Sequence, residues 1–265
     1  MWQGWLVTVL AAMFLHGGSA VAQKPSASLR IAAAADLQPV LPPVLRAFQQ
    51  ATGIEATATY ESSAALTAQM LNGAGFDLFL SADMSYPRKI IAAGLGATAE
   101  PVPYAHGVLV LFTRHDSHWP HPTMELLRET QLKRLAIADP ERAPYGRAAM
   151  AALTSLGLSA ALQPKIVTAA NIAQAAQFAE TGNADAGLIS QTAAVTATLR
   201  AAGSFVVVPQ ELYPVIEQGA VVLALSPRRT EAQRMLDFLR SPEMQRQLQK
   251  SGLNPVTDLA VHTSQ

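Results

Sequence analysis

The fold class is indicated most clearly by residues 29–80, LRIAAAADLQPVLPPVLRAFQQATGIEATATYESSAALTAQMLNGAGFDLFL. Its apolar runs, and its leucine, valine and phenylalanine residues at helical spacing, predict alternating strands and helices. The expected strands are 29–33, 54–60 and 76–80; one expected helix begins near Leu41 and ends at Gly53, and a second spans 64–71. Strands separated by helices in this order form a parallel sheet with right-handed crossovers.

The same kind of pattern begins again in the second part of the chain. Strands are expected at 108–112, 135–138, from 165, at 186–189, 206–208 and 220–225, with helices at 147–156, 172–180 and 230–249. We expect an α/β protein of two doubly wound lobes, joined by a hinge near Tyr104 and Tyr213. Lobe 1 would comprise 23–104 and 213–265, and lobe 2 would comprise 105–212. A single large sheet is the alternative, because loop lengths alone do not exclude it.

Composition narrows the class of protein. The chain has 265 residues, half of them apolar, which is enough for two cores. Its 19 basic and 19 acidic residues balance, so no strong positive field exists to gather nucleic acid. It has no cysteine, which excludes disulfides, thiolate metal sites and cysteine nucleophiles.

The first residues indicate export. An apolar run at 5–15 is followed by the small residues Ala20-Val21-Ala22, which predicts a signal peptide, 1–22, cleaved after Ala22. No Lys or Arg precedes the run. A membrane anchor is the alternative, but the run is shorter than the ~20 residues that a span needs. We expect the mature protein to lie free in the periplasm, with no lipid anchor and no stable membrane insertion.

Four expected strand-to-helix junctions carry residues that suit an anion site. They are Ala35-Asp36, Glu61-Ser62-Ser63, Asp139-Pro140 through Pro144-Tyr145-Gly146, and Ala170-Asn171-Ile172. In open sheets, ligands bind beyond the carboxyl ends of strands, where helix N-termini offer free N–H groups. Each junction taken alone is an ordinary helix cap, contributing about 1 kcal/mol. Together they predict a site of uncharged donors for an anion.

These junctions, together with Phe76-Asp77-Leu78-Phe79-Leu80-Ser81-Ala82-Asp83, resemble the molybdate-binding proteins of bacterial ABC importers, from about Leu29 to Leu253. The resemblance implies the type II periplasmic-binding-protein fold, in which two lobes close over the anion. It also implies capture of molybdate and tungstate by a monomer, and delivery to an inner-membrane ABC permease. No cofactor and no catalysis are implied.

The resemblance places the anion contacts on five residues: Asp36, Ser63, Tyr145, Ile172 and Ser190. It implies backbone N–H donors at Tyr145 and Ile172, and both hydroxyl and N–H at Ser63. Ser190 stands where some members have a tyrosine, so a water would have to bridge its shorter hydroxyl to the ligand.

Asp36 departs from the family pattern, which has a serine, threonine or asparagine there. At about 4 Å and an effective dielectric near 20, each unit of like charge costs on the order of 4 kcal/mol. Three interpretations are open: Asp36 points away and caps a helix, it is protonated when the ligand binds, or the ligand is not a bare oxyanion. The strong capping preference of aspartate favours the first.

Other functions remain as alternatives. The ligand could be sulfate, another oxyanion or a small carboxylate. A periplasmic enzyme using Asp36, Asp83 or Asp139 is disfavoured because no nucleophile–base pair is suggested, and a regulator's sensing domain is disfavoured because no helix-turn-helix segment is present. The cluster His115, His118 and His121, with Asp116, could hold a metal cation, but we expect a solvated loop.

Overall fold

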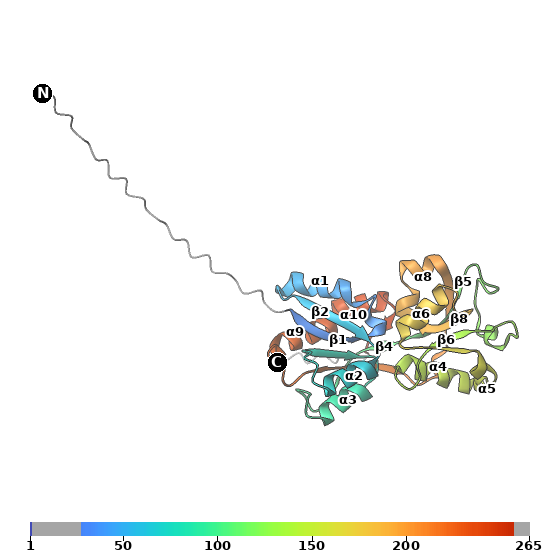
Figure 1. Ribbon diagram of the computed structural model, residues 1–265, viewed down its shortest axis with the longest axis horizontal. Helices are drawn as coiled ribbons and strands as arrows, with labels where there is room; N and C mark the ends of the chain where they lie inside the picture. Colours follow the sequence, from blue (N-terminus) through green and yellow to red (C-terminus); the bar gives the residue numbers. More distant parts are fainter. Residues whose placement is uncertain (2–27, 257–265) are drawn as a thin grey trace.

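The computed structural model describes Met1 and residues 28–256, which form two α/β lobes lying side by side along the long axis of the molecule (Figure 1). Each lobe is built around its own sheet, one of six strands and one of five. The predicted two-lobed α/β fold is therefore confirmed, and the alternative of a single sheet is wrong. The expected cleavage site after Ala22 lies outside the described residues. Among the described residues, every helix is too short or too polar to span a bilayer.

Lobe 1 contains both ends of the continuous segment 28–256. Its elements are β1 (Leu29–Ala34), the 3₁₀ turn η1 (Ala35–Leu37), α1 (Leu41–Thr52), β2 (Ala56–Glu61), α2 (Ser63–Leu71), β3 (Leu78–Ser81), α3 (Ser85–Ala92), β4 (Val102–Gly107), β10 (Ile216–Val222), α9 (Arg229–Arg240), α10 (Pro242–Lys250) and β11 (Leu253–Asn254). The strand order is β11-β4-β10-β3-β1-β2. β1 runs parallel to β2 and β3, whereas β10 runs antiparallel to β3 and β4.

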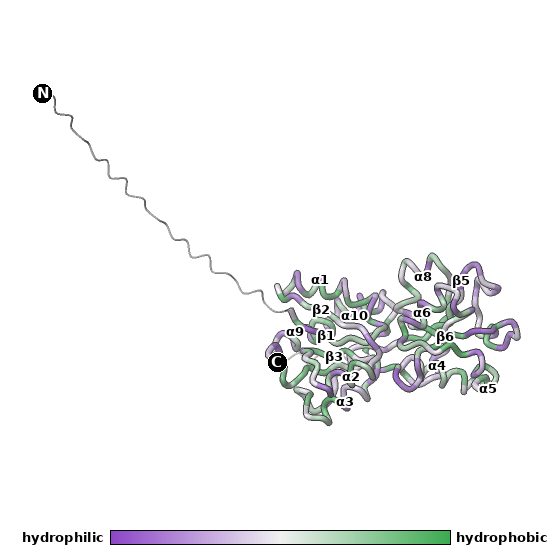
Figure 2. Tube along the Cα trace, viewed as in Figure 1, coloured by the Kyte–Doolittle hydropathy of each residue, from purple (hydrophilic) through white to green (hydrophobic). Residues whose placement is uncertain are grey.

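Helices cover both faces of this sheet, as the βαβ pattern requires. One core contains Phe48 of α1 and Met235 of α9, and the other contains Leu66 of α2 and Ile90 of α3. In Figure 1, α1, α9 and α10 lie on one side of the sheet and α2 and α3 on the other. The central strands β1 and β3 are buried almost throughout and contribute hydrophobic colour to the middle of the lobe in Figure 2, whereas the edge strand β2 alternates between half-buried and exposed residues.

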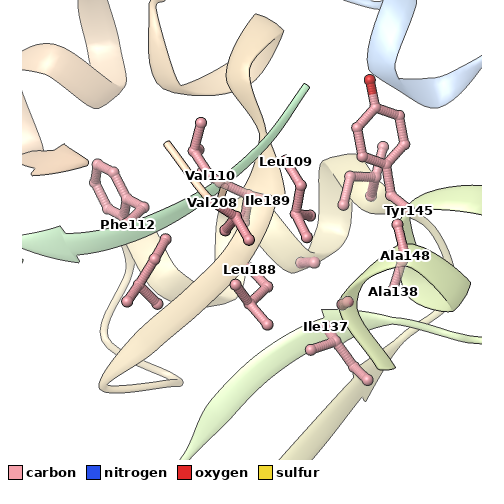
Figure 3. Close-up of a cluster of buried hydrophobic side chains, with 14 of the residues drawn as sticks. Leu109, Val110, Phe112, Ile137, Ala138, Tyr145, Ala148, Leu188, Ile189 and Val208 are labelled. Carbon is pink, nitrogen blue, oxygen red and sulfur yellow. The ribbon is translucent and has the colours of Figure 1, made fainter. Parts of the chain in front are cut away.

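Lobe 2 is one continuous segment. Its elements are β5 (Leu109–Arg114), η2 (Met124–Arg128), β6 (Leu135–Ala138), α4 (Pro144–Ser155), α5 (Ser159–Leu162), η3 (Gln163–Lys165), β7 (Ile166–Ala169), α6 (Ile172–Glu180), β8 (Ala186–Ser190), α7 (Gln191–Ala194), α8 (Ala197–Ala202), β9 (Gly203–Val207) and η4 (Gln210–Leu212). The strand order is β7-β6-β8-β5-β9. Its core, shown in Figure 3, joins Phe112 and Leu188 of the sheet to Ala148 of α4.

Two of the expected elements differ clearly from those observed. The helix expected at 230–249 is two helices, α9 and α10, separated at Ser241. Pro242 disfavours the helical conformation at the residue before it, and Ser241 is accordingly extended. The strand expected at 220–225 is β10, which begins earlier, at Ile216, and ends at Val222.

The chain passes between the lobes twice. The first passage is at Val108, because β4 continues to pair with β10 as far as Gly107, three residues beyond the expected boundary after Tyr104. The second follows β9 and contains Tyr213. The Tyr213 hydroxyl accepts a hydrogen bond from the Leu109 N–H at 3.1 Å, which ties the two passages together.

Candidate functional site

A narrow cavity of about 10 Å³ lies where the two lobes meet. Residues after β1 and β2 line it from lobe 1, and residues after β6 and β7 line it from lobe 2. Four of the five residues expected to contact the anion line this cavity: Asp36, Ser63, Tyr145 and Ile172. Ser190 does not line it; it lines a neighbouring hollow of about 310 Å³, which Asp36 also borders.

Three helices begin at the cavity. Ser63 and Ile172 are the first residues of α2 and α6, and Tyr145 is the second residue of α4. N–H groups in a first helical turn have no acceptor within the helix. Within the described residues, the N–H groups of these three residues donate to no other group. The positive ends of the three helix dipoles point to one place.

The preceding residues cap these helices. The Ser62 hydroxyl accepts from the Ala65 N–H at 3.2 Å, and the Asn171 side chain accepts from the Gln174 N–H at 3.0 Å. Both are therefore ordinary helix caps. They satisfy N–H groups deeper in the first turn and leave those of Ser63 and Ile172 available.

Ser63 contributes a hydroxyl as well as its N–H. Its side chain is buried, and its oxygen accepts a hydrogen bond from the Ala82 N–H at 3.1 Å. This bond anchors the oxygen and leaves its hydrogen free to donate, because a hydroxyl is both acceptor and donor.

The local sequence around Tyr145 brings α4 close to β6. Pro144 begins the helix, where its missing N–H costs nothing. A Cβ on Gly146 would collide with the carbonyl group of Ala138, the last residue of β6, so the helix starts in direct contact with the strand end. A Cβ on Gly107 would collide with the Tyr145 hydroxyl, so this glycine makes room for the ring.

The Tyr145 side chain reaches from lobe 2 into lobe 1. Figure 3 shows its ring at the edge of the lobe 2 core, with its oxygen directed away from that core. The hydroxyl donates to Oδ2 of Asp36 at 3.1 Å. Burial, and the nearby Asp36 carboxylate, raise the pKa of Tyr145 well above its usual value, so the phenol stays protonated.

Asp36 is buried inside η1 and caps no helix, so the interpretation that it points away as a cap is wrong. Its Oδ2 accepts hydrogen bonds from the Tyr145 hydroxyl and from the side-chain amide of Gln218. Its Oδ1 is buried and has no partner among the described residues. Burial raises the pKa of Asp36 to about 6, although the bonds from Gln218 and Tyr145 act in the opposite direction.

Further polar contacts join the lobes beside the cavity. Arg147 of α4 pairs with Asp83 at 2.5 Å and donates to the Tyr86 hydroxyl at 3.2 Å. The Arg142 carbonyl accepts from the Tyr86 hydroxyl at 3.3 Å. These contacts hold the two lobes against each other.

The sequence did not lead us to expect Gln218 beside Asp36 or the pairing of Asp83 with Arg147. Gln218 could have been noticed as a polar residue within the apolar segment of β10. The pairing of Asp83 with Arg147 joins residues 64 positions apart, and nothing in the local pattern indicates it. His115, His118 and His121 belong to no group that could hold a metal ion within residues 28–256.

Comparison with known proteins identifies relatives over most of the chain. The family model for bacterial extracellular solute-binding proteins matches residues 29–254. The molybdate-binding protein ModA of Rhodobacter capsulatus is 37% identical over 77% of this chain and 79% of its own length. ModA of Azotobacter vinelandii is 32% identical over 86% of this chain and 90% of its own length. The structure of the periplasmic molybdate-binding protein of A. vinelandii superposes with a TM-score of 0.80, at 28% identity, over 85% of this chain and 98% of that one.

Proposed function

Because the chain belongs to the bacterial extracellular solute-binding protein family, we propose that it captures molybdate between its two lobes in the periplasm. Tungstate, a second oxyanion of the same kind, would bind at the same place. The loaded protein would then deliver the ion to an inner-membrane ABC permease. The relatives are binding proteins, and the alternative of a periplasmic enzyme is dropped.

One observation carries this proposal: three helix N-termini, from both lobes, meet at one cavity, and the N–H groups of Ser63, Tyr145 and Ile172 are unpaired within the described chain. Such groups bind anions without a counter-charge, because the helix dipole and the N–H bonds both favour negative charge. No Lys, Arg or His is among the described residues that line the cavity. Apart from the carboxyl groups of Asp36 and Glu61, the cavity is lined by neutral residues. Neutral donors suit a fully ionised oxyanion, which needs no acceptor from the protein.

The proposed contacts follow from this geometry. Ser63 donates its N–H and hydroxyl, and Tyr145 and Ile172 donate their N–H groups. Ser190 would act through a water, because its hydroxyl already accepts from Thr192 at 2.9 Å and it faces the neighbouring hollow. The cavity has room for about one water, so the lobes must part to admit a four-oxygen ion and close over it again.

Titration calorimetry of the mature protein with molybdate, tungstate and sulfate tests the proposal. We expect the first two to bind with micromolar or tighter affinity, and sulfate not to bind. If none of the three ions binds, the ligand is of another class. If sulfate binds more tightly than molybdate, sulfate is the ligand instead.

A further inference from the structure

We propose that the oxyanion is captured together with one proton, which lies between Oδ1 of Asp36 and the nearest ligand oxygen. The inference rests on the proposed function, because it concerns the same site. It assigns Asp36 the part of a hydrogen-bond donor that a neutral residue would otherwise play.

The two oxygens of the Asp36 carboxyl group have different surroundings. Oδ2 accepts hydrogen bonds from Tyr145 of lobe 2 and from Gln218 of β10. Oδ1 is equally buried and has no partner among residues 28–256. Asp36 lines both the cavity and the hollow beside it. A buried oxygen with no partner is costly, and a proton on it would supply the donor that the cavity wall otherwise lacks there.

The charges around Asp36 do not neutralise it. Glu61 at the end of β2 lines the cavity, and Glu180 of α6 lines the hollow. No basic side chain lines either space within the described part of the chain. The elements that pack on η1 therefore offer Asp36 no cation.

The remaining neighbours are uncharged. Tyr145 of α4 and Tyr104 of β4 stay protonated, since burial and the Asp36 carboxylate raise both of their pKa values. The α7 segment has no ionisable residue. β10 presents Gln218, whereas the adjacent Glu217 is exposed on the opposite face of the strand.

A doubly charged ligand therefore approaches a buried acid that no cation in either lining compensates. Without ligand, the pKa of Asp36 is already raised to about 6 by burial. A nearby dianion disfavours the carboxylate further and raises this pKa again. At neutral pH the free site is mostly ionised, so binding takes one proton from solvent. The protonated Oδ1 then donates to the ion, and the repulsion becomes a hydrogen bond.

Calorimetry in pairs of buffers with different ionisation enthalpies measures this proton directly. At about pH 8 we expect close to one proton taken up per molybdate bound, and at about pH 5 close to none, because Asp36 is then protonated beforehand. Affinity should fall about tenfold per pH unit above pH 7 and level off below pH 6. Binding without proton uptake at pH 8 would overturn the inference and leave the proposed function intact.

Variants separate Asp36 from other groups. Asp36→Asn keeps the shape and donates permanently, so it should bind more tightly than the parent at pH 8, with no proton uptake and no pH slope. Asp36→Ser, which restores a neutral donor of the family type, should also lose the uptake if the first variant fails to fold. Glu180→Gln is the matched control and should still take up the proton on binding. Uptake that persists in both Asp36 variants would overturn the inference, whereas no binding of any oxyanion by the parent would overturn the proposed function with it.

Discussion

At the scale of single residues, Asp36 makes stability depend on pH. Its pKa is about 6 in the folded protein against an ordinary 3.8, so folding favours the protonated form. The stabilisation that the protonated form gives to the folded state is complete below about pH 3.8 and is lost as the pH rises through 6. Above that pH, burial of the charged form lowers the free energy of unfolding. The difference between the two values corresponds to about 3 kcal/mol.

Asp36→Asn should therefore be more stable than the parent at about pH 8, by up to ~3 kcal/mol, and little different at about pH 4. Urea unfolding of both proteins at the two pH values measures this. An equal difference at both would show that the carboxyl group does not titrate as its burial requires.

Ser63→Ala tests the hydroxyl contact. Losing a hydrogen bond to a charged ligand should cost ~1.5–3 kcal/mol of binding free energy. The Ala82 N–H would also lose its acceptor, so some stability should be lost as well. Ser241→Ala, which removes the cap of α10 at Met244, is the control, because it should lower stability alone. Unchanged affinity in Ser63→Ala would show that the ligand does not contact this hydroxyl.

The positions of Ser63, Tyr145 and Ile172 could be predicted from sequence because first-turn residues after a strand are defined by their neighbours along the chain. The surroundings of Asp36 could not. Tyr145 and Gln218 are 109 and 182 residues away from it, so only the closed fold brings them to its carboxyl group.

At the scale of elements, the start of α4 depends on Gly146. A methyl group there would meet the Ala138 carbonyl and the Asp139 backbone, and neither can turn aside as a side chain can. Gly146→Ala should lower stability by about 1–3 kcal/mol and weaken oxyanion binding, because the Tyr145 N–H would shift with the helix. Gly75→Ala is the control, since its Cβ would meet only the end of the Arg30 side chain, at 3.3 Å. Equal effects in the two variants, by urea unfolding and calorimetry, would contradict this account.

Helices and strands differ in how well the sequence predicted them. The βαβ segments of lobe 1 followed from local periodicity. The break at Pro242 could also have been predicted, since proline disfavours helix at the residue before it. β4 was not, because its sequence, Val102 to Gly107, mixes Pro103 and His106 with apolar residues and shows no regular alternation. Its pairing with β10 and β11 makes it a strand.

At the scale of the whole molecule, the Arg147–Asp83 pair favours the closed arrangement. Both side chains are partly exposed, so the pair is worth about 1 kcal/mol or less for closure. Arg147→Ala should therefore weaken oxyanion binding by up to about fivefold, because a closed state that is less populated lowers apparent affinity in proportion.

The control is Arg134→Ala, which removes an ion pair to Asp185 within lobe 2 and should leave affinity unchanged. Small-angle scattering without ligand should show a larger radius of gyration for Arg147→Ala alone. Equal radii and affinities would mean that the pair does not influence closure.

The double passage between lobes also sets the order in which a growing chain can fold. β4 and β10 are neighbours in one sheet, yet all of lobe 2 is synthesised between them. Lobe 2 is contiguous and can complete its sheet as soon as it emerges. β3 and β4 each have an unpaired edge until β10, which lies between them, has been synthesised. Open strand edges invite aggregation. The half that is made first is thus finished last, and a nascent polypeptide interrupted before Ile216 would carry an intact second lobe on an unfinished first one.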